Sequence, residues 1–134
     1  MKTPYLVFML FISTQIIPAQ AENNTVTTLL QTYASLGATE ASAAQGKQLW
    51  RKVFLSNSEY SERSCASCHT EDLNAPGKHI KTGKSIKPMA SSVNPERLSD
   101  KKKVEKWFKR NCKWTMGREC TAQEKASFLL YINN

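Results

Sequence analysis

Cys65-Ala66-Ser67-Cys68-His69 is the stretch of sequence that decides the fold. In one helical turn, residues at i, i+3 and i+4 project from the same face, so both thiols and the imidazole point in one direction. Thiols in this arrangement can form thioethers with the vinyl groups of a haem, while the imidazole binds the iron. We therefore expect one covalent haem c, held by Cys65 and Cys68, with His69 as an iron ligand.

Three other uses of the cysteines fit the sequence less well. A zinc site built from all four needs a second pair spaced by roughly two to four residues, but seven residues separate Cys112 from Cys120. A thioredoxin-like redox pair lacks its βαβ context. A structural disulfide between Cys65 and Cys68 is the remaining alternative. The five-residue motif favours haem attachment over all three.

The first 21 residues have the pattern of an export signal. Lys2 gives a basic start, residues 5–17 supply an apolar stretch, and Ala19-Gln20-Ala21 forms a small-x-small cleavage site. The apolar stretch is too short and too interrupted by polar residues to span a bilayer, so we expect no stable membrane insertion. We expect cleavage after Ala21, a cytochrome domain over residues 22–134, and a periplasmic location.

The chain carries an excess of positive charge, which bears on the kind of partner that it binds. It has 19 Lys and Arg against 11 Asp and Glu, a formal net charge of +8. Nucleic acid is a poor candidate partner, because the chain is exported and has no recognisable binding motif. Docking to an acidic redox donor explains the excess, with solubility as the plainer alternative. The candidates for such docking recur through the central loop: Lys78, Lys81, Lys84 and Lys87.

Apolar spacing predicts a single all-α domain. We expect a short leading helix around 29–33, a helix from an N-cap at Thr39 to about Phe54, and a long loop over residues 70–98. Further helices are expected from Ser99 or Asp100 to about Asn111, and after a capping box at Thr121 and Glu124. Gly46, in the middle of the second of these helices, indicates that another helix approaches closely there.

The second axial ligand of the iron is left open by spacing alone. Met116 lies just before the last helix, where many small cytochromes present a methionine. Met89 is flanked by proline and is expected to pack at the haem edge, and His79 lies among lysines and is expected to be solvent-exposed. Asn111 ends the apolar stripe Val104-Trp107-Phe108, so its amide either points inward to the iron or caps the helix.

Other motifs of the sequence carry a family resemblance. They are Asn111-Cys112, Gly117-Arg118-Glu119-Cys120-Thr121, Glu124-Lys125, residues 103–110 and Ser92-Val93-Asn94-Pro95. With the attachment motif, they resemble the sphaeroides haem protein family of monohaem cytochromes c over most of residues 40–132. The resemblance implies a class I cytochrome c-like fold, with N- and C-terminal helices around one haem. It also implies Asn111 as sixth iron ligand and a Cys112–Cys120 disulfide, and places Met89 and Met116 off the ligand position.

The function that the resemblance implies depends on release of the asparagine. On reduction Asn111 leaves the iron, so that oxygen, nitric oxide or a similar small ligand binds the ferrous haem, and a dihaem cytochrome c is the implied electron donor. An amide oxygen is a hard ligand, which ferric iron tolerates and softer ferrous iron retains poorly. The alternative is a plain electron carrier with His69–Met116 coordination. No residue indicates a committed general acid or base, so enzymatic turnover is left open, and an electron-transfer and ligand-binding protein is favoured.

Overall fold

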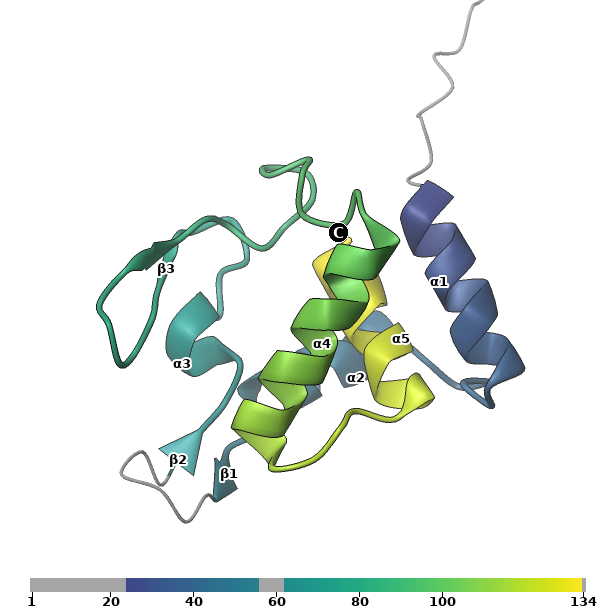
Figure 1. Ribbon diagram of the computed structural model, residues 1–134, viewed down its shortest axis with the longest axis horizontal. Coiled ribbons are helices and arrows are strands. Elements are labelled where there is room, and N and C mark those ends of the chain that lie inside the picture. Colours follow the sequence, from purple (N-terminus) through teal and green to yellow (C-terminus); the bar gives the residue numbers. More distant parts are fainter. Residues whose placement is uncertain (1–23, 56–61, 134) are drawn as a thin grey trace, which may run out of the picture.

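The computed structural model describes residues 24–55 and 62–133, and within them the chain is mainly helical (Figure 1). The helices are α1 (Asn24–Ser35), α2 (Ala43–Arg51), α3 (Ala66–His69), α4 (Lys101–Met116) and α5 (Ala122–Ile132). Two antiparallel pairs of two-residue strands close loops: β1 (Phe54–Leu55) with β2 (Glu62–Arg63), and β3 (Gly77–Lys78) with β4 (Ser85–Ile86). The predicted all-α class with a loop-rich middle is confirmed. The predicted signal segment, residues 1–21, lies outside the described residues.

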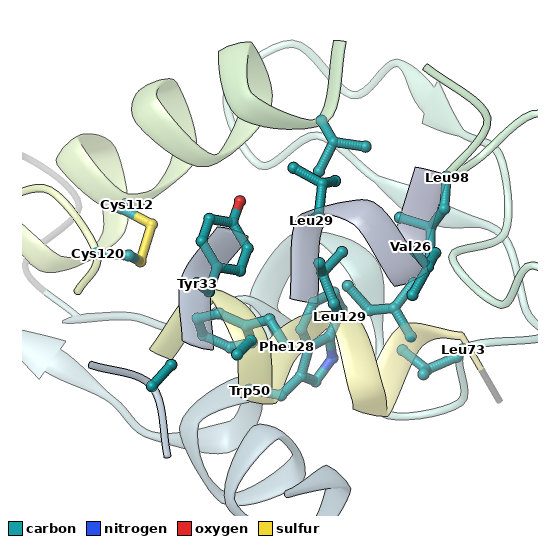
Figure 2. Close-up of a cluster of buried hydrophobic side chains, with 14 of the residues drawn as sticks. Val26, Leu29, Tyr33, Trp50, Leu73, Leu98, Cys112, Cys120, Phe128 and Leu129 are labelled. Carbon is teal, nitrogen blue, oxygen red and sulfur yellow. A yellow bond between two sulfur atoms is a disulfide. The ribbon is translucent and has the colours of Figure 1, made fainter. Parts of the chain in front are cut away.

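The core is built around the contact between α2 and α5. A Cβ atom at Gly46 would lie 2.1 Å from the carbonyl oxygen of Ser127, so only glycine lets the two helices come this close. The close helix approach predicted at Gly46 is confirmed. Trp50 of α2 and Phe128 of α5 pack edge to face, with ring centroids 6.3 Å apart (Figure 2). In the described part of the chain, no helix is long and apolar enough to cross a membrane.

The second predicted helix is shorter than the sequence indicated. Its N-cap is Ser42 rather than Thr39, because the Ser42 side chain accepts a hydrogen bond from the backbone N–H of Gln45 at 3.2 Å. The helix ends at Arg51 instead of near Phe54, since Phe54 pairs with Arg63 in the β1–β2 ladder. The pairing of these two strands draws the chain out of the helix and towards the attachment motif.

Helix α4 is longer than the sequence indicated. Asp100 caps it as predicted, accepting from the N–H of Lys103 at 3.0 Å. The expected end near Asn111 was wrong: the helix continues to Met116 and stops at Gly117, whose φ of 73° lies in the left-handed region that favours glycine. Asn111 is therefore inside a helix, and its alternative role as a helix C-cap is wrong.

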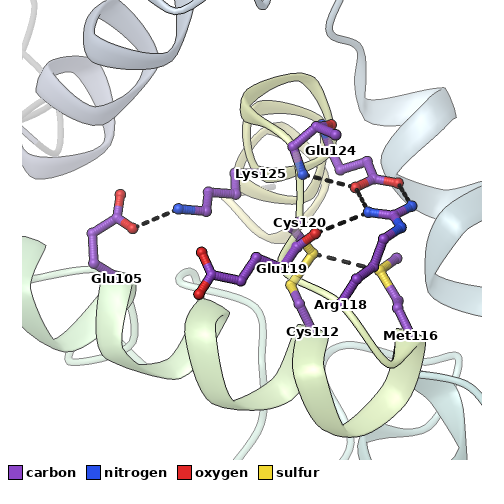
Figure 3. The surroundings of a disulfide bond; sticks show 9 residues. Glu105, Cys112, Met116, Arg118, Glu119, Cys120, Glu124 and Lys125 are labelled. Carbon is purple, nitrogen blue, oxygen red and sulfur yellow. Dashed lines mark hydrogen bonds and ion pairs between the residues drawn. A yellow bond between two sulfur atoms is a disulfide. The ribbon is translucent and has the colours of Figure 1, made fainter.

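A polar contact joins α1, α4 and α5 at the far end of the core. Tyr33 of α1 is almost fully buried, and its hydroxyl donates a hydrogen bond to the carboxylate of Glu105 on α4. The same carboxylate accepts from the ammonium of Lys125 on α5 at 2.8 Å (Figure 3). Burial raises the pKa of Glu105, but the hydrogen bonds from Lys125 and Tyr33 outweigh burial and hold this pKa below its usual value.

This contact predicts how stability depends on pH. A carboxyl whose pKa is depressed by folding stabilises the fold above its ordinary pKa, and the stabilisation is lost as the pH falls through the folded value. Glu105→Gln should therefore lower the melting temperature by a few degrees at pH 7, and the gap to the wild type should narrow below about pH 4. Glu40→Gln, at an exposed position, is the matched control. A gap that is equally wide at pH 7 and pH 3 would contradict the role of the ionised carboxylate.

Candidate haem site

The attachment motif forms a short helical turn, and two serines form a hydrogen-bonded cap at its start. Ser64 and Ser67 exchange hydrogen bonds: each backbone N–H donates to the hydroxyl of the other at 3.1 Å. Behind this cap, the N–H of His69 donates to the carbonyl of Cys65 at 3.0 Å. The serine between the two cysteines therefore has a structural role that the motif did not reveal.

Both cysteines and the histidine of the motif line one cavity of about 730 Å³. This volume lies in the range of roughly 300–1,000 Å³ that cofactor sites occupy. Cys68 is buried and Cys65 half-buried, and both are free thiols. Burial raises the pKa of the Cys65 thiol to about 12, so it stays uncharged. The cavity thus offers two thiols and an imidazole to one bound group, as haem c requires.

His69 is positioned by packing. Its ring centroid lies 5.5 Å from that of Trp50, and its Nδ1 atom is buried without a hydrogen-bond partner among the described residues. Burial, together with the nearby Arg97 and His79, lowers the pKa of His69 to about 4. A neutral imidazole that no neighbouring group has engaged is free to bind a metal through a ring nitrogen. The residues present therefore fit a haem iron.

The backbone after His69 is strained and is held in place by two contacts. Thr70 has φ of 63° and ψ of 172°, a region that is essentially restricted to glycine. The indole N–H of Trp50 donates to the carbonyl of Thr70 at 2.7 Å. On the other side of the turn, a Cβ atom at Gly77 would lie 2.1 Å from the carbonyl oxygen of Cys68. Trp50 and Gly77 together fix where the turn places its imidazole.

Helix α4 is a second element whose residues line the cavity. The predicted apolar stripe lines the cavity, and so does Asn111. Asn111 makes no side-chain hydrogen bond with the described residues, so its amide is available to a ligand or a metal. The sequence thus placed Asn111 on the side of the helix that lines the cavity, but the residue is exposed rather than buried, and the helix was ended too early.

The other candidates for the sixth position also line the cavity. His79 was expected to be solvent-exposed, but it is half-buried, and its Nδ1 atom accepts from the N–H of Thr82 at 3.3 Å in the loop between β3 and β4. The sulfur of Met116, the last residue of α4, lies 3.6 Å from that of Cys120, so it packs against the disulfide (Figure 3). Met89 is held in its loop by a hydrogen bond from its N–H to the carbonyl of Leu73.

A disulfide between Cys112 and Cys120 follows Asn111 directly. Both half-cystines are buried, with Cα atoms 5.5 Å apart, and they join α4 to the segment that leads into α5 (Figure 2). Because these sulfurs bond to each other, the four-cysteine zinc site is excluded. Among the described residues, no group of three or more His, Cys, Asp or Glu side chains could hold a metal ion. The carboxylate of Glu124 braces the same segment by accepting two hydrogen bonds from Arg118, at 2.7 and 2.8 Å.

Arg63 connects the attachment segment to α4, and sequence reasoning missed it. Its side chain is only 7% exposed, its Nη1 donates to the carbonyl of Trp114 at 2.6 Å, and its guanidinium lies 4.2 Å from the centre of the Trp114 ring. The carbonyl of Trp114 is among the last four of the helix, which have no partner within the helix. A cation there is also favoured by the helix dipole. A single arginine before the motif gives no sequence signal for this contact.

The chain is similar to known proteins in sequence and in fold. Residues 36–132, which contain all the site residues above, match the family model described as a domain of unknown function, DUF1924. The chain is 36% identical over 118 residues to the cytochrome c-type protein SHP of Cereibacter sphaeroides, and the match covers 86% of this chain and 88% of that protein.

Solved structures of two relatives share the fold. Oxidised SHP, described as an oxygen-binding cytochrome c, matches with a TM-score of 0.73 and 34% identity over 80% of this chain and 94% of its own. The solution structure of cytochrome c'' from Methylophilus methylotrophus, described in terms of haem-ligand detachment, matches with a TM-score of 0.71 and 34% identity. That match covers 81% of this chain and 92% of the other.

The contact between Arg63 and Trp114 predicts a stability difference. Arg63→Gln removes a buried, charge-assisted hydrogen bond of about 1.5–3 kcal/mol, which corresponds to a loss of roughly 6–12 °C in melting temperature for a domain of this size. Arg51→Gln is the control, because its guanidinium is about half exposed and pairs with the exposed carboxylate of Glu71 at the surface, where such pairs contribute little. Thermal unfolding of the haem-loaded proteins measures both. Equal shifts in the two variants would show that Arg63 does not anchor the helix.

Proposed function

The chain belongs to the sphaeroides haem protein family of monohaem cytochromes c, and from this premise we propose that reduction frees its distal haem face for a small diatomic ligand such as oxygen or nitric oxide. In this proposal Cys65 and Cys68 hold one haem c by thioethers, His69 is the proximal ligand, and Asn111 is the distal ligand that leaves. The observation that carries the proposal is that Asn111, on α4, lines the same cavity as the whole attachment motif.

The proximal side is suited to permanent binding. Trp50 and Gly77 fix the turn that carries His69, and burial keeps the imidazole neutral. Bound between these residues, haem iron supplies one-electron redox chemistry and a sixth coordination position. A histidine held by packing stays in place when the charge of the iron changes.

The distal side is suited to reversible binding. The amide oxygen of Asn111 is a hard donor, so an added electron on the iron weakens its hold. The helix behind it is fixed by the disulfide at Cys112 and by the contact of Arg63 with Trp114. A rigid support presents a weak ligand in one place, so the amide can leave without displacing the helix.

The relatives support the ligand class. SHP is described as oxygen-binding and cytochrome c'' as a protein whose haem ligand detaches, and we propose both properties for this chain. A second candidate function, an electron carrier with His69–Met116 coordination, is favoured by the presence of Met116 in the cavity wall. The packing of its sulfur against Cys120 argues against it.

The proposed setting is the periplasm, reached through cleavage after Ala21, with a dihaem cytochrome c or another acidic redox protein as donor. The lysines at positions 78, 81, 84 and 87 are all exposed, on or beside the β3–β4 hairpin. His79 and Ile86 of that hairpin line the cavity, so the basic surface borders the haem site. A donor that docks there would approach the haem across a short distance.

The ligand assignment predicts opposite effects for two variants. Asn111→Ala should leave the ferric sixth position open, with a high-spin absorption spectrum, while the ferrous protein still binds carbon monoxide. Met116→Leu, the matched control, should leave both spectra unchanged. Absorption spectra of the oxidised, reduced and carbon monoxide-treated proteins measure this. Loss of a methionine-to-iron charge-transfer band in Met116→Leu, with no change in Asn111→Ala, would contradict the proposal.

The docking surface predicts a dependence on salt. The rate of electron transfer from an acidic donor cytochrome should fall by roughly tenfold or more between 10 mM and 200 mM salt, because steering by opposite charges is screened. Charge reversal in Lys78→Glu/Lys84→Glu should lower the low-salt rate, and Lys47→Glu on α2 should not. Stopped-flow reduction of the haem measures these rates. Rates that do not change with salt would show that the lysines do not take part in docking and serve only the solubility of the protein.

A further inference from the structure

Thr115 is a buried polar residue that the proposed function does not yet use. Its side chain is only 5% exposed and lines the haem cavity from α4. A threonine inside a helix commonly donates to the carbonyl four residues earlier, as Thr32 does to Thr28 in α1 at 2.9 Å. Thr115 makes no such bond, and its hydroxyl has no partner among the described residues. Among the described residues, the only fully buried side-chain N or O atom without a partner is His69 Nδ1. The hydroxyl of Thr115 is therefore open to the cavity, where it offers a hydrogen-bonding group to a neighbouring side chain.

Helix geometry brings this hydroxyl next to Asn111. The two residues are four apart in a continuous helix, and side chains at that spacing are neighbours, with Cβ atoms about 5–6 Å apart. An amide both donates and accepts hydrogen bonds, and so does a hydroxyl, so the two groups match. On the other side of Asn111, at the same spacing, stands Trp107, which is 44% exposed and stacked under the guanidinium of Arg110. Thr115 is the buried polar neighbour of the two.

The part of α4 that carries Thr115 is fixed. The disulfide holds Cys112, and Arg63 holds the carbonyl of Trp114, the residue before Thr115. The hydroxyl therefore keeps its position whatever the side chain of Asn111 does. A fixed hydrogen-bonding group one turn away can receive a side chain that rotates off the iron.

We propose that Thr115 is a positioning residue whose hydroxyl hydrogen-bonds the amide of Asn111 after the amide has left the iron. The bond retains the amide away from the haem, which keeps the distal face open in the reduced protein. This inference rests on the proposed function, because it needs Asn111 to be a ligand that leaves. It assigns a role to a residue that no sequence motif singled out.

The test compares Thr115→Val, which keeps the shape and removes the hydroxyl, with Thr115→Ser, which keeps the hydroxyl. Each is made in the wild-type chain and in Asn111→Ala, and the reduction potential of the haem is measured by spectroelectrochemistry. Loss of a hydrogen bond of typical strength shifts the equilibrium between the detached and the iron-bound amide in the reduced protein by roughly fivefold. A tenfold change in a one-electron equilibrium corresponds to 59 mV, so a fivefold change corresponds to about 40 mV. Thr115→Val should lower the potential by that amount, and Thr115→Ser should restore it.

The double-variant comparison decides the mechanism. If Thr115 acts through Asn111, Thr115→Val causes no shift of potential in the Asn111→Ala background. An equal shift in both backgrounds would overturn the inference. A changed C–O stretching frequency of the carbon monoxide complex in Thr115→Val would also overturn it, because the hydroxyl would then contact the bound ligand instead. If Asn111→Ala alone leaves the ferric spectrum unchanged, the proposed function itself fails, which is a distinct result.

Discussion

The contact of Arg63 with the carbonyl of Trp114 is the link on which the arrangement of the site depends. It joins the strand that leads into the attachment turn to the helix that carries Asn111, so the two walls of the cavity are directly connected. The guanidinium satisfies a carbonyl at the end of α4 and stacks on the indole of the same residue. Because the link is buried, water does not compete for it. It fixes the spacing between the proximal and distal residues before any group is bound.

The rest of the fold supports each wall separately. On the proximal side, Trp50 connects the α2–α5 core to the turn, since it packs on Phe128 and His69 and donates to Thr70. On the distal side, α4 is held near its start by Glu105 and near its end by the disulfide. A helix fixed at several points gives Asn111 little freedom except rotation of its own side chain. This rigidity is what a weak and reversible ligand requires.

The sequence was most informative where chemistry depends on local spacing. The motif from Cys65 to His69 placed both thiols and the imidazole on one cavity, and the capping box at Thr121 is present with both of its hydrogen bonds. The apolar stripe placed Asn111 on the cavity face. The end of α4 was predicted too early because the apolar stripe was taken to end at Asn111. The buried residues Cys112 and Thr115 lie beyond it, and the helix continues through them to Met116.

Contacts between distant residues could not be predicted in this way. Arg63 and Trp114 are 51 positions apart, and Trp50 and Thr70 are 20 apart, so no periodicity relates them. His79 is likewise half-buried because the β3–β4 hairpin that carries it lies against the cavity, a contact that its neighbours in the sequence do not reveal. Crystal structures of the haem-loaded protein in the ferric and ferrous states would show whether Asn111 is a ligand that leaves on reduction. We expect the Asn111 side-chain oxygen to be bonded to iron in the ferric crystal and to have left it in the ferrous one. A sulfur of Met116 bonded to iron in both states would contradict it.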